Sequence, residues 1–219
     1  MECFTCEEMQ RRRKCTAPGY GRKKSRRYQA GIKKADDIRG YVLAIDQDWL
    51  LMAKTRDGGY PDGFTALRVV DVTKVRKDGS FEARFLRHID QWPPAGPSAP
   101  IDLSNSRTII TGAAALQTLV TLYTEQKWPD ECYIGAPVDW EKKRVWLLEV
   151  DGQAHWKRDM SPYHLKKITR IDFGGDYERA LLAVAGPLPP RTAPETSEQA
   201  SPVNRRAAVP SEAPPSVRK

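Results

Sequence analysis

The sequence predicts a mainly β (α+β) fold of two tandem small antiparallel β-barrel-like units, joined by a Pro-rich linker and one α-helix. Three observations lead to this prediction. The stretch Val72-Thr73-Lys74-Val75 returns as Ile168-Thr169-Arg170-Ile171, with every pair 96 positions apart. Short β-type runs separated by turn residues surround both copies. A single amphipathic helical stretch lies between them. A repeat at a fixed offset is typical of duplicated structural units.

A second repeated pattern lies upstream of each copy. Trp49-Leu50-Leu51 and Trp146-Leu147-Leu148 are related by an offset of 97. We interpret the one-residue difference between the two offsets as a loop insertion between related units. This places Trp49 and Trp146 at equivalent strand positions, where we expect both to serve core packing.

Residues 1–34 are predicted to form a disordered basic arm. They hold eleven Lys and Arg against three Glu, whereas residues 35–186 carry a net charge of −2 and residues 187–219 a net charge of +2. The excess charge of the chain therefore lies in the arm. Cations on a flexible segment bind phosphates without reading sequence. The predicted nucleic-acid-binding residues are Arg11, Arg12, Arg13, Lys14, Arg22, Lys23, Lys24, Arg26 and Arg27.

The first β unit is predicted to cover residues 35–90. Residues 40–45 and 49–54 are β-type runs around a polar turn, and the Gly-rich residues 57–63 suit a long hairpin loop. The strand that ends at Val75 follows, and residues 81–86 are either a short strand or a helical turn.

A linker, a helix and the second unit complete the fold. Residues 91–105 are Pro-rich and cannot continue a sheet. Residues 106–127 are predicted to form a helix with Ser104 or Asn105 as its N-cap. The second β unit covers residues 132–186, and its residues 177–184 close it, with a short helix as one reading. Residues 187–219 are rich in Pro, Ala, Ser and Glu and are predicted to be disordered.

No catalytic signature is present, so we expect a protein that is not an enzyme. The sequence has no Walker loop, dinucleotide fingerprint, nucleophile elbow or zincin motif. The less favoured alternative is an enzyme with a site between the two units that uses His155, His164 and nearby acids.

Three cysteines near the N-terminus are the nearest approach to a metal motif. Cys3, Cys6 and Cys15 supply three thiolates, whereas a structural zinc site needs four ligands. Cys132 completes the set only if the arm folds back onto the second unit. We therefore expect no cofactor and keep zinc as the alternative. Met9 also allows a later start, in which case residues 1–8 are not part of the native protein.

The composition predicts a cytoplasmic protein without a membrane segment. The N-terminus has no apolar signal-peptide core, and no run approaches the ~18 apolar residues of a membrane helix.

The layout of the two units resembles that of Sm-like and SH3-like small β-barrel proteins. The resemblance rests on a Gly in the first strand of each unit (Gly40, Gly135), on the strand and turn of residues 145–152, and on the predicted helix before the second unit. It covers about residues 35–90 and 106–184, and it implies a bent five-stranded sheet in each unit. The Asp-x-x-Asn loop and Arg-Gly turn with which Sm proteins bind RNA have no clear counterpart here.

Together these features predict a non-enzymatic binding protein. The first expectation is an association with RNA or DNA through the basic arm and the tandem core. The alternative is a protein–protein interaction or regulatory module that binds no nucleic acid.

Overall fold

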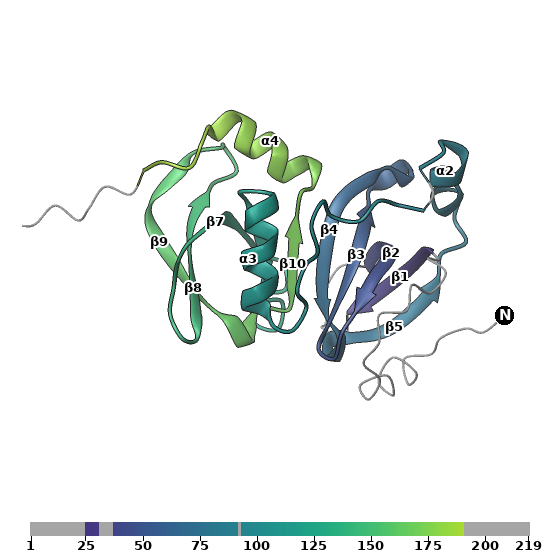
Figure 1. Cartoon of the computed structure of the whole chain (residues 1–219), viewed down its shortest axis with the longest axis horizontal. Coiled ribbons are helices and arrows are strands. Elements are labelled where there is room, and N and C mark those ends of the chain that lie inside the picture. The colour runs from purple at the N-terminus through teal and green to yellow at the C-terminus, as the bar shows by residue number, and fades with distance from the viewer. Residues whose placement is uncertain (1–24, 31–36, 92, 191–219) are drawn as a thin grey trace, which may run out of the picture. The chain divides into compact units, whose positions relative to one another are not determined.

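The computed structural model describes residues 25–30, 37–91 and 93–190. In these residues the chain is mainly β, and all the strands belong to one antiparallel sheet in the order β5-β1-β2-β3-β4-β10-β6-β7-β8-β9 (Figure 1). The predicted fold class is confirmed at this level, whereas two separate barrels are not what the pairing shows. The strands are β1 (Ser25–Ala30), β2 (Asp37–Ile45), β3 (Trp49–Thr55), β4 (Pro61–Arg68), β5 (Val72–Lys77), β6 (Val120–Tyr123), β7 (Cys132–Trp140), β8 (Arg144–Val150), β9 (Trp156–His164) and β10 (Arg170–Phe173).

Short helical segments follow the strands. The 3-10 helices are η2 (Asp57–Gly59), η3 (Val69–Asp71) and η4 (Leu165–Lys167), and the α-helices are α2 (Glu82–His88), α3 (Ser106–Leu116) and α4 (Asp176–Ala185). Residues 81–86 and 177–184, for which a short helix is one of the expectations, are therefore mainly helical. No helix in the described part of the chain is both long and apolar enough to span a membrane.

Apart from η2, which occurs only in the first half, the same order of elements occurs in residues 37–88 and again in residues 132–185: three strands, a 3-10 helix, a further strand and an α-helix. The hydrogen-bond registers agree in detail. The pairing of β2 with β3 is interrupted between Val42 and Ala44, and that of β7 with β8 between Pro137 and Asp139, 95 positions later. Two residues at corresponding register positions of the two halves are called equivalent.

Two glycines show why this register is fixed. Gly40 is opposite Lys54 and Gly135 is opposite Glu149. A Cβ atom at Gly40 would lie 2.2 Å from the Ala53 carbonyl oxygen, and one at Gly135 would lie 2.4 Å from the equivalent oxygen of Leu148. Because neither strand tolerates a side chain there, both positions require glycine.

The register corrects the offset expected for the Trp-Leu-Leu pattern. Trp49 is opposite Arg68, and Arg144 is opposite the equivalent residue His164, so β3 and β8 are related by 95 positions and not by 97. Trp146 is therefore equivalent to Leu51. Trp49 is buried, whereas Trp146 is half-buried and its indole Nε1 donates to Glu141 Oε1 at 3.1 Å.

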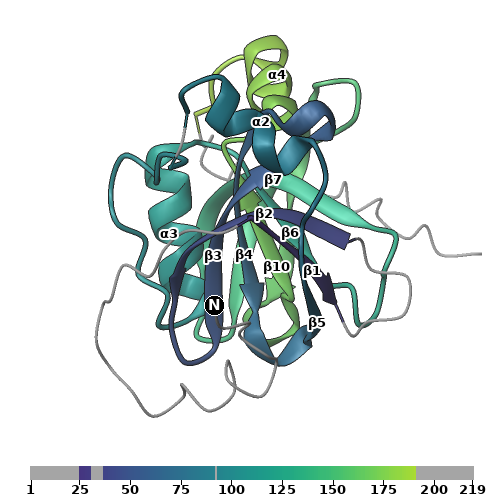
Figure 2. The ribbon, with the colours of Figure 1, turned by 90° about the vertical axis from the view of Figure 1, so that its right-hand side faces the viewer.

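The repeated Val-Thr-Lys-Val stretch has different surroundings in its two copies. β10 lies between β4 and β6 at the centre of the sheet, and all four of its residues are buried. β5 is an end strand of the described sheet and has mostly exposed side chains. Figure 2 shows β3, β4 and β10 running side by side. One repeated stretch therefore sits in the core and the other at an edge.

The largest core cluster takes side chains from both halves of the chain. It combines residues of β3 and β4 with residues of α3, β6, β8 and β10, with one residue before α3 and with one residue before β10: Trp49, Leu51, Ala66, Leu103, Ile109, Ile110, Ala113, Val120, Leu122, Val145, Leu147, Ile168, Ile171 and Phe173. A shared core of this kind, together with the β4–β10 pairing, makes the two halves parts of one sheet instead of independent barrels.

The central helix is shorter than predicted. Asn105 is its N-cap, as expected, and accepts a hydrogen bond from Thr108 N at 3.1 Å. The helix ends at Leu116, however, and Val120–Tyr123 forms β6, which pairs with β7 and β10. The apolar spacing of this stretch suits either structure, and pairing on both edges overrides its helical periodicity.

The boundaries of the arm, the linker and the tail also differ in part from the prediction. The charge of Ser25–Ala30 predicts that this segment belongs to the disordered arm. Instead it forms β1, which pairs with β2 and β5. The first group of strands therefore begins before residue 35. Residues 93–105 contain no strand or helix, as expected of the linker. The predicted disorder of residues 1–24, 31–34 and 191–219 lies outside the described residues.

Candidate functional site

The described end of the basic arm lies in the sheet beside a second basic strand. In the register of β1 and β5, Arg26 is opposite Lys77 and Arg27 is opposite Arg76. Gln29 is opposite Lys74 on the same pair of strands. Neither strand contains an acidic residue. The fold therefore gathers five cationic positions on two adjacent strands, and the three of β5 are not among the residues predicted from sequence.

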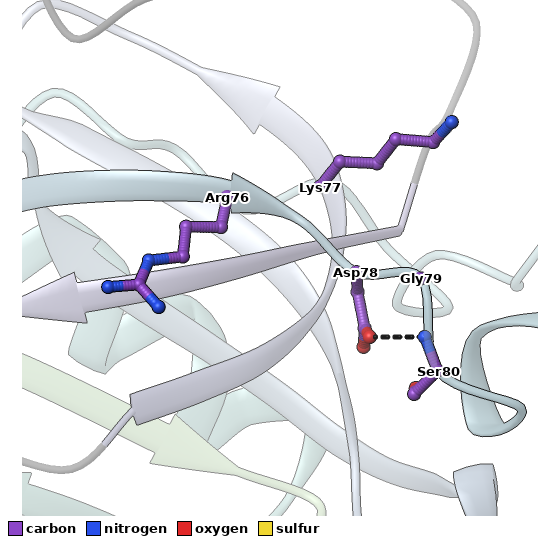
Figure 3. Close-up of a pocket in the computed structure, with 5 residues that line it drawn as sticks. All are labelled: Arg76, Lys77, Asp78, Gly79 and Ser80. Atoms are coloured by element: carbon purple, nitrogen blue, oxygen red, sulfur yellow. Dashed lines mark hydrogen bonds between the residues drawn. The ribbon is translucent and has the colours of Figure 1, made fainter.

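The cations of β5 are accessible. Lys74, Arg76 and Lys77 are exposed. Figure 3 shows Arg76 and Lys77 extending away from each other along the two sides of the strand, next to a depression of about 200 Å³ that also contacts Asp78, Gly79 and Ser80. The Asp78 carboxylate accepts a hydrogen bond from Ser80 N at 3.0 Å, which fixes the turn after the strand.

The remaining predicted phosphate-binding residues lie outside the described part of the chain: Arg11, Arg12, Arg13, Lys14, Arg22, Lys23 and Lys24. The weak zinc candidates Cys3, Cys6 and Cys15 lie outside it as well. Cys132 is exposed at the start of β7. Within residues 25–30, 37–91 and 93–190, no group of three or more His, Cys, Asp or Glu is arranged to hold a metal ion.

A buried charged cluster lies where β4 pairs with β10. Asp172 is almost completely buried and accepts hydrogen bonds from Thr65 Oγ1 at 2.5 Å and from Lys54 Nζ at 3.2 Å. Arg170 Nε and Nη2 also donate to this carboxylate, at 2.9 and 2.5 Å. Lys54 Nζ lies 3.2 Å from Asp62 Oδ2 as well. One carboxylate is thus held by charges from both halves of the chain.

The pKa values of this cluster reflect the balance of burial and pairing. Burial raises the pKa of Asp172, but the Arg170 guanidinium and Lys54 outweigh it and lower that pKa to about 2. Burial lowers the pKa of Lys54, and the carboxylates of Asp172 and Asp62 reverse the effect, so the pKa is raised. Asp172 and Lys54 are therefore both charged near neutral pH, and their contacts join β10 to the first half of the chain.

This cluster does not emerge from the sequence pattern, because Asp62 and Asp172 stand close to glycines and resemble ordinary turn residues. Asp172 instead lies within β10, and Asp62 lies within β4. The alternation of Arg170 and Asp172 around Ile171 was a usable signal, since residues i and i+2 share one face of a strand.

A second charged cluster surrounds Glu149 on β8. Its carboxylate accepts hydrogen bonds from Lys157 Nζ and from the Tyr163 hydroxyl, both at 2.6 Å. Burial raises the pKa of Glu149, but the hydrogen bonds from Lys157, Ser161 and Tyr163 prevail and lower it. Tyr163 also contacts Tyr133, with ring centroids 4.6 Å apart.

His155 and His164, the residues of the less favoured hypothesis of an enzyme, are not brought together. His155 directly precedes β9 and His164 is the last residue of β9, so they lie at opposite ends of the strand. His155 Nδ1 lies 3.6 Å from Asp151 Oδ2, and His164 Nδ1 accepts a hydrogen bond from Lys166 N at 3.3 Å. Each imidazole thus has a local partner in its own turn.

No protein-family model matches this chain, and no curated protein or solved structure is significantly similar to it.

Proposed function

We propose that this protein is a non-enzymatic nucleic-acid-binding protein whose phosphate-binding surface runs from the basic arm onto β1 and β5. The observation that carries the proposal is the register of these two strands, which brings Arg26 and Arg27 alongside Lys77 and Arg76. Several adjacent cations without an intervening acid are the electrostatic signature of phosphate-backbone binding.

The proposed binding is independent of base sequence. The cations of β5 extend from an exposed strand of the sheet, where they contact phosphates more readily than base edges. Affinity should therefore depend steeply on salt, because each phosphate contact releases bound counterions.

We also propose that residues 25–88 and 120–185 are two copies of one Sm-like or SH3-like unit. Four features support this. The order of the strands, the interruptions between β2 and β3 and between β7 and β8, and the glycines at positions 40 and 135 agree between the halves. The 3-10 helices are also anchored alike, since Val69 N donates to Asp48 O at 2.9 Å and Leu165 N donates to Lys143 O at 2.9 Å.

The test is a titration of a fluorescent single-stranded RNA of about 20 nucleotides, longer than a typical single-strand site, followed by anisotropy at several salt concentrations. The variant Lys74→Gln/Lys77→Gln removes two exposed cations of β5. We expect roughly tenfold weaker binding near physiological salt, and a slope of log K against log salt that is smaller by about 1.5. Single-stranded and duplex DNA of the same length serve as further ligands.

A matched control removes the same charge elsewhere. Lys142→Gln/Lys143→Gln changes two exposed cations in the turn between β7 and β8 and should leave the affinity nearly unchanged. A chain without residues 1–24 separates the arm from the strands, because it keeps β1 in the sheet. Equal binding by all four chains would refute the proposed surface. An absence of binding by the wild type would favour the alternative, a protein-interaction module.

A further inference from the structure

The two end strands of the sheet are equivalent to the two strands that join the halves of the chain. β4 is the fourth strand of the first half, and its equivalent is β9; β10 is the last strand of the second half, and its equivalent is β5. β4 pairs with β10 within the chain, whereas β9 and β5 are the ends of the described sheet. A β5–β9 contact between two chains can therefore have the same geometry as the β4–β10 contact within one chain.

We propose that the chain self-associates head to tail, with β9 of one copy pairing antiparallel with β5 of the next. The β4–β10 register, in which Phe64 to Leu67 are opposite Phe173 to Arg170, sets the geometry. Transferred to the equivalent residues, it places Met160 opposite Lys77, Ser161 opposite Arg76, Pro162 opposite Val75 and Tyr163 opposite Lys74. Such a contact uses two different surfaces and is therefore repeatable from copy to copy.

Charge complementarity supports a second copy of the chain as the partner in this contact. Inside the chain, Lys54 lies between two carboxylates, Asp62 of its own half and Asp172 of the other half, at 3.2 Å from each. Asp172 is 1% exposed, so the carboxylate of this contact between the halves is buried. A buried charge of this kind requires a partner of opposite sign.

All three charges are inverted at the equivalent positions, which hold Glu149, Lys157 and Arg76. Glu149 is the register counterpart of Lys54, since both are opposite the equivalent glycines at positions 135 and 40. The ion pair between Lys54 and Asp62 has an equivalent in the second half with the signs reversed, since Lys157 Nζ lies 2.6 Å from Glu149 Oε2. The third member, Arg76, is exposed on β5. Pairing with a second copy would bring it to Glu149, as Asp172 is brought to Lys54.

The outer edge of β9 also explains why this contact would be weaker than the one within the chain. Leu165 N donates to Lys143 O, just before β8, so by alternation the backbone nitrogens of His164, Pro162 and Met160 face outward. Pro162 has no N–H and removes one of these three donors, a device that protects an edge against indiscriminate pairing. We therefore expect association to depend on concentration in the micromolar range typical of modest interfaces.

The experiment measures mass by light scattering and native mass spectrometry on nuclease-treated protein, so it does not depend on the proposed nucleic-acid binding. The wild type should form species whose masses are multiples of 24.7 kDa. In the proposed contact, Arg76→Asp places a carboxylate beside Glu149. Glu149→Lys/Lys157→Asp recreates the Lys54–Asp62 pair and places a lysine beside Arg76. Each variant alone should raise the concentration of half-association about a hundredfold.

Mixing the two variants provides the decisive readout. In the mixture every β5–β9 contact between unlike variants pairs opposite charges. The carboxylate introduced by Arg76→Asp meets the ammonium introduced by Glu149→Lys, and the unchanged Arg76 of one variant meets the unchanged Glu149 of the other. Association should therefore return to near the wild-type level.

A turn cation supplies the control, since Lys142→Asp should behave like the wild type. A wild type that stays at 24.7 kDa up to high concentration would overturn the proposal. So would variants that associate like the wild type, or a mixture that does not associate.

Discussion

Replacement of Asp172 by Asn tests how strongly the buried cluster holds the two halves together. The substitution keeps the shape of the side chain but removes the charge that pairs with Arg170 and Lys54. Arg170 and Lys54 both sit in largely buried positions, with side chains 6% and 18% exposed. Loss of one partner of a buried ion pair costs about 3–5 kcal/mol, because the remaining charges stay desolvated. For a chain of this size that corresponds to a fall in Tm of roughly 10 °C.

The measurement is urea unfolding followed by tryptophan fluorescence, for which the buried Trp49 in the shared core is a natural reporter. Asp159→Asn is the matched control, since Asp159 is exposed on β9 and should change the free energy of unfolding by less than about 0.5 kcal/mol. A loss below about 1 kcal/mol for Asp172→Asn would refute the assignment of the cluster as the fixing element of the β4–β10 interface. A transition that splits into two steps would show instead that the halves unfold separately.

Two further predictions concern stability. The pKa of Asp172 is lowered to about 2 in the folded chain and is about 3.9 when unfolded, so its stabilising effect of about 2–3 kcal/mol is present above pH ~4 and is lost as the pH falls to ~2. Asp172→Asn should therefore abolish this part of the acid dependence in urea titrations. An unchanged pH profile would count against the pairing. Gly135→Ala should destabilise the chain by about 2 kcal/mol, because its Cβ would lie 2.4 Å from the Leu148 carbonyl oxygen. The control Gly152→Ala, whose Cβ would have no atom within 4 Å, should cost less than about 0.5 kcal/mol. Equal losses of stability in calorimetry would show that the close approach is not the cause.

Much of the fold follows from local sequence. The alternating apolar runs and Gly-rich turns predicted most strands, and the side chain of Asn105 predicted the start of α3. The repeated Val-Thr-Lys-Val pattern indicated the equivalence of two segments. Each of these signals acts within a few residues, so the sequence carries it without reference to the rest of the chain.

The partners of each strand are decided by tertiary structure, and this is where the sequence predictions failed. Ser25–Ala30 has the charge of a solvated arm, yet it pairs with β2 on one side and with β5 on the other. Val120–Tyr123 continues a helical spacing, yet it pairs on both sides as a strand. In both segments the hydrogen bonds and burial supplied by distant strands outweigh the local preference.

The candidate sites divide in the same way. The sequence by itself determined the basic character of the arm and named Arg26 and Arg27, because charge is a property of composition. Only the tertiary structure decided that these residues lie beside Lys77 and Arg76, and that Asp172 meets Lys54 across the two halves. Residues 118 positions apart come within 3.2 Å because β4 and β10 share an edge, and the register of a strand pair is fixed by the packing of the whole sheet.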